Sequence, residues 1–203
     1  MTHGQRLAPR TELQERRRSP SQTVSAIEPS ELVRFWSDAG PSRWFSKDPA
    51  FDRLFRERYI DAHLSAARGR LEAWLATPRG ALALLLLTDQ FPRNAFRGTA
   101  HMYATDGLAR SFARRASDEH FMDDTEVSLR PFFCLPFAHS EYLADQDFSV
   151  QLHEQIGQPW LSHAHGHRDI IRRFGRFPHR NRVLGRQSTR EEQDFLDAGG
   201  FAG

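Results

Sequence analysis

The chain has 203 residues, of which 39% are hydrophobic and 27% charged, with four Trp and sixteen Phe, so it is large enough to bury a sizeable core. The longest apolar run, residues 81–88, is too short to span a bilayer, and the N-terminus lacks the apolar stretch of a secretory signal. The single cysteine, Cys134, excludes an intramolecular disulfide. We therefore expect a cytoplasmic protein that does not insert into membranes.

Charge is distributed unevenly along the chain. The net charge is +2, but residues 1–25 alone hold five Arg and two Glu, which leaves −1 for residues 26–203. We predict that residues 1–25 are a disordered basic extension and that residues 26–203 form one folded domain. A second basic segment, residues 168–190, holds eight Arg and one Asp.

Helical periodicity begins at Pro29 and continues to the C-terminus. We expect helices, in chain order, over residues 30–39, 49–67, 71–75, 78–91, 99–116, 140–156 and 159–174. Asp48 before Pro49 is typical of a capped helix start.

Prolines and polar residues set several expected boundaries. The apolar helix from Pro78 should end at Phe91-Pro92, and Pro131 and Pro136 should break residues 129–138 into short pieces. Ser188 or Thr189 with Glu191 or Glu192 predicts a capping box for a last short helix. Sustained alternation typical of strands is missing from the sequence, so we predict an all-α fold of antiparallel helix pairs.

One short pattern occurs twice. Residues 84–98 read LLLLTDQFPRNAFRG and residues 170–185 read IIRRFGRFPHRNRVLG, so each copy has an apolar run, Phe-Pro, Arg-Asn and a later Gly. The dense polar groups beside apolar segments indicate fixed geometry at helix ends. Such geometry serves either internal structure or a binding site.

The strings LLLLTDQFPRNAFRGTA, PFAHSEYLADQ and HRDIIRRFGRFPHRNRVLGRQST, with WFSKDPAFD upstream, resemble the bacterial domain of unknown function 924 family. The resemblance runs from about Leu32 to the C-terminus and implies a tetratricopeptide-like arrangement of helix pairs. It implies no activity. The family usually has Glu-Arg ahead of its Phe-rich segment, where this chain has Leu129-Arg130.

The first polar cluster ends the most apolar helix. Asp89 and Arg93 are four residues apart and can pair on one helical face. With Gln90 and Asn94 they either lock the helix end or form the wall of a polar pocket.

The second cluster follows the apolar run that ends at residue 138. His139 titrates near neutrality, and Glu141 and Asp145 are expected one turn apart on one face. His139 and Glu141 are therefore our candidates for acid–base chemistry, although acidic residues in a first helical turn also serve as dipole partners. The same two carboxylates beside His139 are also a candidate site for a divalent cation.

The third cluster combines histidines and arginines near the C-terminus. His163 and His167 have the spacing of a zinc pair, but a third ligand is not evident, so we expect no metal and no cofactor. The further candidates for contact with an anion are His167, Asp169, Arg173, Arg176, His179, Arg180 and Asn181. The same arginines could instead form ion pairs, with Asp169, Arg173 and Arg176 as a ladder along one helix.

Three functions are consistent with these residues. The leading hypothesis is one polar pocket for a small anionic ligand, with proton transfer by His139 and Glu141. Its expected ligand-binding residues are Asp89, Gln90, Arg93, Asn94, Asp145, His167, Asp169, Arg173, Arg176, His179, Arg180 and Asn181. The first alternative is a non-enzymatic scaffold that binds a protein or peptide, the polar motifs being an internal network. The second is nucleic-acid binding through residues 168–190, which the near-neutral domain disfavours.

Overall fold

The computed structural model describes Met1 and residues 27–203, and in this part of the chain every regular element is helical. The predicted disorder of residues 1–25 falls almost wholly on residues outside that range. The elements are α1 (Pro29–Ala39), α2 (Pro41–Trp44), α3 (Pro49–Ala67), η1 (Glu72–Ala76), α4 (Pro78–Leu85), η2 (Leu86–Gln90), α5 (Phe91–Ala95), η3 (Ala100–Tyr103), α6 (Asp106–Asp118), η4 (Val127–Leu129), α7 (Pro131–Ala138), α8 (Leu143–Ile156), α9 (Trp160–Phe174), η5 (Pro178–Arg180) and α10 (Arg190–Asp197). The prediction of an all-α protein is confirmed. None of these helices has the length and apolar character needed to cross a bilayer.

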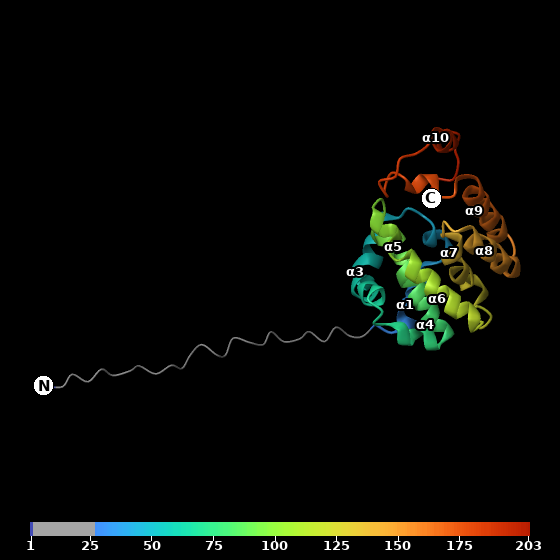
Figure 1. Ribbon diagram of the computed structural model, residues 1–203. Helices are drawn as coiled ribbons and strands as arrows, with labels where there is room; N and C mark the ends of the chain where they lie inside the picture. The colour runs from blue at the N-terminus through green and yellow to red at the C-terminus, as the bar shows by residue number, and fades with distance from the viewer. Residues whose placement is uncertain (2–26) are drawn as a thin grey trace.

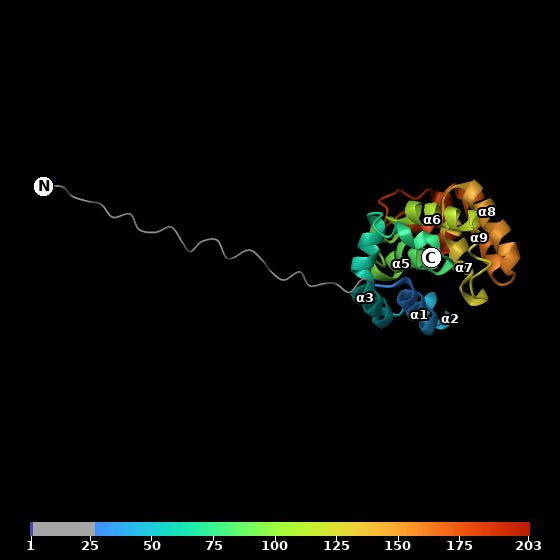
Figure 2. The same cartoon turned by 90° about the horizontal axis from the view of Figure 1, so that it is seen from below.

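Helices α5, α6 and α7 lie between two flanks of the molecule (Figures 1 and 2). One flank is α3, and the other is the hairpin of α8 and α9, whose two helices pack closely along each other. The C-terminal segment, with η5 and α10, covers one end of this array (Figure 1). Residues from the middle and the end of the chain therefore meet there.

The core is built largely of aromatic rings on α1, α3 and α7. Trp36 is fully buried, and its ring lies 5.3 Å from that of Phe55 and 5.5 Å from that of Phe132. Trp44 stacks on Trp36 at 6.2 Å and donates its indole hydrogen to the Trp36 carbonyl at 2.7 Å. These contacts fix the turn after α2, whose next residue, Phe45, remains 52% exposed.

The apolar helix from Pro78 continues beyond Phe91-Pro92, which corrects the predicted helix end. Pro92 has no amide hydrogen for the Thr88 carbonyl, and in a regular α-helix its ring would clash there. The chain avoids the clash by widening into the π-helical turn η2, in which the Phe91 amide donates to the Leu86 carbonyl. The helix then resumes as α5 and ends at Ala95.

The π turn frees carbonyl groups, and side chains from other parts of the chain satisfy them. The His63 ring bonds to the Leu87 carbonyl through Nδ1 at 2.9 Å, and the Thr105 hydroxyl donates to the Thr88 carbonyl at 2.6 Å. Arg93 donates from Nη1 to the Asp89 carbonyl at 2.8 Å. Because π turns change the direction of the side chains that follow, η2 sets where Asp89 and Gln90 point.

Residues 131–138 form one helix, α7, with Pro136 inside it, so the prediction of short broken pieces is wrong. Every residue of α7 is buried, and this apolar burial outweighs the one hydrogen bond that Pro136 cannot make. The Gln146 side chain caps the helix end by donating to the carbonyls of Ala138 and Ser140 at 2.8 and 2.6 Å. His139 is thereby held at the C-terminal end of α7.

Helix α8 begins at Leu143, three residues later than predicted. The Ser140 hydroxyl accepts from the Tyr142 amide at 3.2 Å and donates to Asp145 Oδ2 at 2.7 Å, which makes a turn of residues 140–142. Since Glu141 lies in this turn, it does not share a helical face with Asp145. The prediction that these two carboxylates form a pair beside His139 is wrong.

The capping box predicted for the last helix is confirmed. Thr189 accepts from the Glu192 amide at 3.2 Å, and Glu192 accepts from the Thr189 amide at 2.7 Å. Glu192 also accepts from Arg176 Nε and Nη2 at 2.6 and 2.8 Å. These bonds tie α10 to the segment after α9.

Candidate functional site

A cavity of about 460 Å³ lies where α5, α7 and α9 meet the C-terminal segment, a volume typical of small-molecule sites. Apolar side chains form much of its wall, notably Phe45, Leu135, Ala138, Trp160 and Ala164. The charged side chains in its lining are Arg93, Arg97 and Arg180, and among the residues the structure describes no Asp or Glu side chain lines it. The ionisable wall is therefore arginine and histidine.

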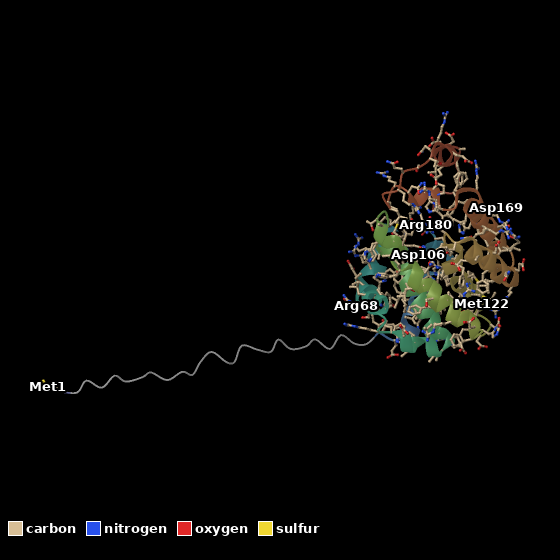
Figure 3. All side chains as sticks on the ribbon, viewed as in Figure 1. Met1, Arg68, Asp106, Met122, Asp169 and Arg180 are labelled. Atoms are coloured by element: carbon tan, nitrogen blue, oxygen red, sulfur yellow. The ribbon has the colours of Figure 1, made fainter. Side chains whose placement is uncertain are left out.

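The two copies of the repeated pattern meet at this cavity. Arg93, from the first copy, donates to both carboxylate oxygens of Asp106 at 2.9 and 3.1 Å. Arg180, from the second, lies 3.5 Å from Asp106 Oδ2, and Figure 3 labels these two residues beneath the C-terminal segment. Tyr103 faces both guanidinium groups, at 5.7 Å from Arg93 and 4.5 Å from Arg180. Two segments 86 residues apart thus share one carboxylate and one ring.

Asp89 and His139 form a buried pair at the base of the cavity. His139 Nδ1 lies 2.8 Å from Asp89 Oδ1, so the ring donates its Nδ1 hydrogen to this carboxylate. Gln90 donates to the other Asp89 oxygen at 2.7 Å, and Arg93 lies 3.2 Å from Oδ1. The second nitrogen of His139, Nε2, is left without a protein partner in residues 27–203, and the ring lines the cavity.

Charge and burial set the protonation states of this pair. Burial alone raises the pKa of Asp89, but Arg93, His139 and Gln90 together reverse this and hold its pKa well below the usual range. Burial lowers the pKa of His139, and the charge of Arg93 lowers it further, against the opposing effect of Asp89. Near pH 7 the pair is an ionised carboxylate beside a neutral imidazole. Nε2 of that imidazole is then a hydrogen-bond acceptor and a proton acceptor.

Three buried nitrogens of cavity-lining residues lack a hydrogen-bond partner within residues 27–203: His167 Nδ1, His179 Nδ1 and Arg180 Nε. Such groups are rare in folded proteins, because each gives up its bonds to water without compensation. Arg180 is the most costly of the three, since it carries a charge and its side chain is only 7% exposed. Burial lowers its pKa to about 10, with the nearby Arg93 acting in the same direction.

The structure places half of the predicted residues in the lining of one cavity and one more, Asp89, beside it. Those that line it are Gln90, Arg93, Asn94, His139, His167, His179 and Arg180. Asp89 lies directly behind His139 and reaches the cavity through it. Within residues 27–203, no group of three His, Cys, Asp or Glu side chains is placed to hold a metal ion.

The other predicted residues lie elsewhere, which corrects their expected placement. Glu141 accepts from Arg186 Nη1 and Nη2 at 2.6 and 3.0 Å, and from the Phe177 amide at 2.8 Å. Asp145 pairs with Arg110 at 3.2 Å. Asn181 donates to Ser188 Oγ at 3.1 Å. Glu141 and Asn181 therefore hold loops together, and Asp145 joins α8 to α6, outside the lining of the cavity.

The predicted ladder of Asp169, Arg173 and Arg176 is wrong. Arg173 pairs with Glu191 at 2.9 Å and Arg176 with Glu192 at 2.6 Å, so both reach across to α10. Asp169 lies apart from Asp106 and Arg180 (Figure 3), in a second hollow that Phe195 and Phe201 also line. Much of the positive charge of residues 168–190 is thus matched by carboxylates of the same protein.

Sequence reasoning missed several residues of the site. Asp106 begins α6, where an acidic residue is the ordinary partner of a helix dipole, so nothing in the sequence marked it as an arginine ligand. Tyr103, Phe45 and Trp160 belong to none of the polar clusters, so nothing in the sequence sets them apart from aromatic residues of the core. Arg186 follows the second pattern closely, and its position beside Gly185 was a usable signal.

The comparisons with known proteins agree with this fold. The family model described as a bacterial protein of unknown function (DUF924) matches residues 32–200. A solved structure of a protein of unknown function from Agrobacterium tumefaciens is 51% identical to the chain, with a TM-score of 0.83, over 84% of this chain and 97% of that one. None of the curated proteins matches. The resemblance predicted from the motifs is confirmed, and the chain belongs to the DUF924 family of bacterial proteins.

Proposed function

We propose that the cavity binds a small anionic ligand, held by Arg180 and Arg93 beside His139. The observation that carries the proposal is Arg180. Its guanidinium is buried between the rings of Tyr103 and Phe177, at 4.5 and 4.4 Å, and its one carboxylate contact in the described chain is at 3.5 Å. A buried cation with so little compensation is costly, and an anion in the cavity supplies what it lacks.

His139 gives the site a group that can exchange a proton with the ligand. Asp89 fixes the ring and its tautomer through Nδ1, which leaves Nε2 as the reactive position. Glu141 has no part in this proposal, because Arg186 and the Phe177 amide occupy its oxygens.

The tetratricopeptide-like arrangement, the cytoplasmic location and a role as a protein-binding scaffold stay predictions.

The proposal separates a binding role of Arg180 from a structural one. Arg180→Met keeps an apolar side chain of similar length between the two rings and removes the charge. We expect the variant to be as stable as the parent or more stable, by up to about 2 kcal/mol, because a poorly paired buried charge is lost. Urea unfolding measures this. A loss of more than about 2 kcal/mol assigns Arg180 a structural role and contradicts the proposal.

Ligand binding is tested with hexanoate, benzoate and inorganic phosphate as probes, each at millimolar concentration. A probe at 100 times its dissociation constant adds about 2.7 kcal/mol of stability, which shifts the melting temperature measurably. We expect at least one probe to stabilise the parent and the control Arg172→Gln, because the Arg172 side chain is half-exposed, pairs with Asp147 on α8 and does not line the cavity. The same probe should leave the melting temperature of Arg180→Met unchanged. Failure of all three probes to stabilise the parent overturns the proposed function.

A further inference from the structure

We infer that the ligand is a hydrophobic monocarboxylate, that is, a single carboxylate group on an alkyl or aryl body. This inference rests on the proposed function and narrows it. It follows from the charge balance at one end of the cavity and from the apolar wall at the other.

The charges around the head of the site limit the ligand to one negative charge. Arg93 and Arg180 face the carboxylates of Asp89 and Asp106, and His139 between them is neutral.

Arg180 has only one carboxylate contact within residues 27–203, at 3.5 Å, so it can take up one negative charge. A dianion would bring a second charge with no free cation in the described lining to compensate it, because Arg97, the third cation of the lining, is paired with Asp52 at 2.8 Å. The carboxylates of Asp89 and Asp106 repel any negative charge in the cavity, and Arg180 offsets this repulsion for one charge only.

The geometry of Arg180 favours a carboxylate as the head group. Arg180 Nη1 is the atom nearest Asp106, and Nε has no partner among the described residues. A guanidinium presents its N–H groups as a planar fork, which matches the two oxygens of a carboxylate. In Arg180 the Nη groups are the ones that can reach a ligand, because Nε is buried. Arg180 packs against the rings of Tyr103 and Phe177, at 4.5 and 4.4 Å, which restricts the movement of its guanidinium before a ligand arrives.

The remaining wall is suited to an apolar body. Leu135 and Ala138 on α7 and Ala164 on α9 are buried residues that line the cavity. Phe45 and Trp160 meet edge to face, with ring centroids 5.4 Å apart, and both also line it. Phe45 stays 52% exposed, and an alkyl or aryl group beside it would remove apolar surface from water. An inorganic anion has no apolar group to contact these residues, so it would gain nothing from this part of the cavity.

The experiment measures dissociation constants by calorimetry for butyrate, hexanoate and octanoate, with octanamide and octyl phosphate as comparators. Burial of one methylene group contributes about 0.8 kcal/mol, so we expect the affinity to rise about fourfold per methylene until the cavity is filled. Octanamide, which lacks the charge, and octyl phosphate, which carries two, should both bind at least about tenfold more weakly than octanoate.

Two variants test the apolar wall. Trp160→Ala should reduce the gain in affinity per methylene, and Phe45→Ala, which removes a half-exposed side chain, should reduce it to a smaller extent. The matched control is Tyr142→Ala, an exposed aromatic residue outside the cavity lining, which should leave the series unchanged.

The outcomes separate the two claims. If carboxylates bind but their affinity does not depend on chain length, or if octyl phosphate binds more tightly than octanoate, the inference is overturned while the proposed function stands. If no carboxylate and no phosphate binds at any length, the proposed function itself fails.

Discussion

Asp89→Asn is expected to lower the free energy of unfolding by about 3–5 kcal/mol. The Asp89 side chain is 1% exposed and is in contact with His139, Gln90 and Arg93. Its removal leaves Arg93 in a buried position with one carboxylate in place of two, and leaves the Nδ1 hydrogen of His139 without a charged acceptor. The asparagine fits the space, so the loss reports the charge and not a cavity.

Urea unfolding of the parent and the variant measures this loss. Asp147→Asn is the matched control, because Asp147 is 44% exposed and its pairs with Arg168 and Arg172 lie on the surface at 3.7 and 3.4 Å. Such a pair contributes about 0–1 kcal/mol. Equal effects of the two substitutions would show that the Asp89 cluster does not anchor the site.

The second large effect is a loss of stability as the pH falls from about 6.5 to 5. Burial, with the charge of Arg180 acting in the same direction, lowers the pKa of His167 to about 3 and that of His179 to about 4. Unfolded histidine titrates near 6.5, so in this window the unfolded chain binds protons that the folded protein does not. Stability is therefore fully present above about pH 6.5 and falls below it.

Each of these two histidines should cost roughly 2 kcal/mol of stability at pH 5, as an upper value. The window is selective, since ordinary carboxylates titrate below it. Unfolding curves at a series of pH values should show a slope that decreases in His167→Gln and in His179→Gln. His120→Asn, which changes an exposed histidine with φ of 57°, should keep the parent slope. A stability that is flat between pH 6.5 and 5 would contradict the neutral, buried state of these rings.

The all-helical fold was predictable because helical periodicity and caps are local properties. Asp48 caps α3 by accepting from the amides of Ala50 and Phe51, as its place before Pro49 indicates. The exceptions are at prolines. Pro92 and Pro136 were predicted to break helices, but a π turn accommodates the first and complete burial of α7 outweighs the second. The side chains that satisfy the carbonyls of η2 and the residues that bury α7 come from distant parts of the chain, so the sequence around each proline does not reveal them.

The candidate site was only partly predictable for the same reason. The repeated pattern indicated Arg93 and Arg180, but their shared partner, Asp106, lies 13 residues from one and 74 from the other and occupies an ordinary helix start. Glu141 is predicted as a catalytic residue because it follows His139 closely in the sequence. The turn at Ser140 directs it instead to Arg186, 45 residues away. Long-range pairing of this kind depends on the packing of α7, α8 and the C-terminal segment.

The most direct test of the central claim is a crystal structure of the protein grown with octanoate. We predict that the carboxylate lies about 3 Å from an Nη atom of Arg180, within hydrogen-bond distance, with the alkyl chain along Leu135 and Ala164 toward Trp160. The Nε2 atom of His139 should face the same cavity. Octanoate bound elsewhere, or a cavity that holds only water at a saturating concentration, would contradict the assignment of this cavity as an anion-binding site.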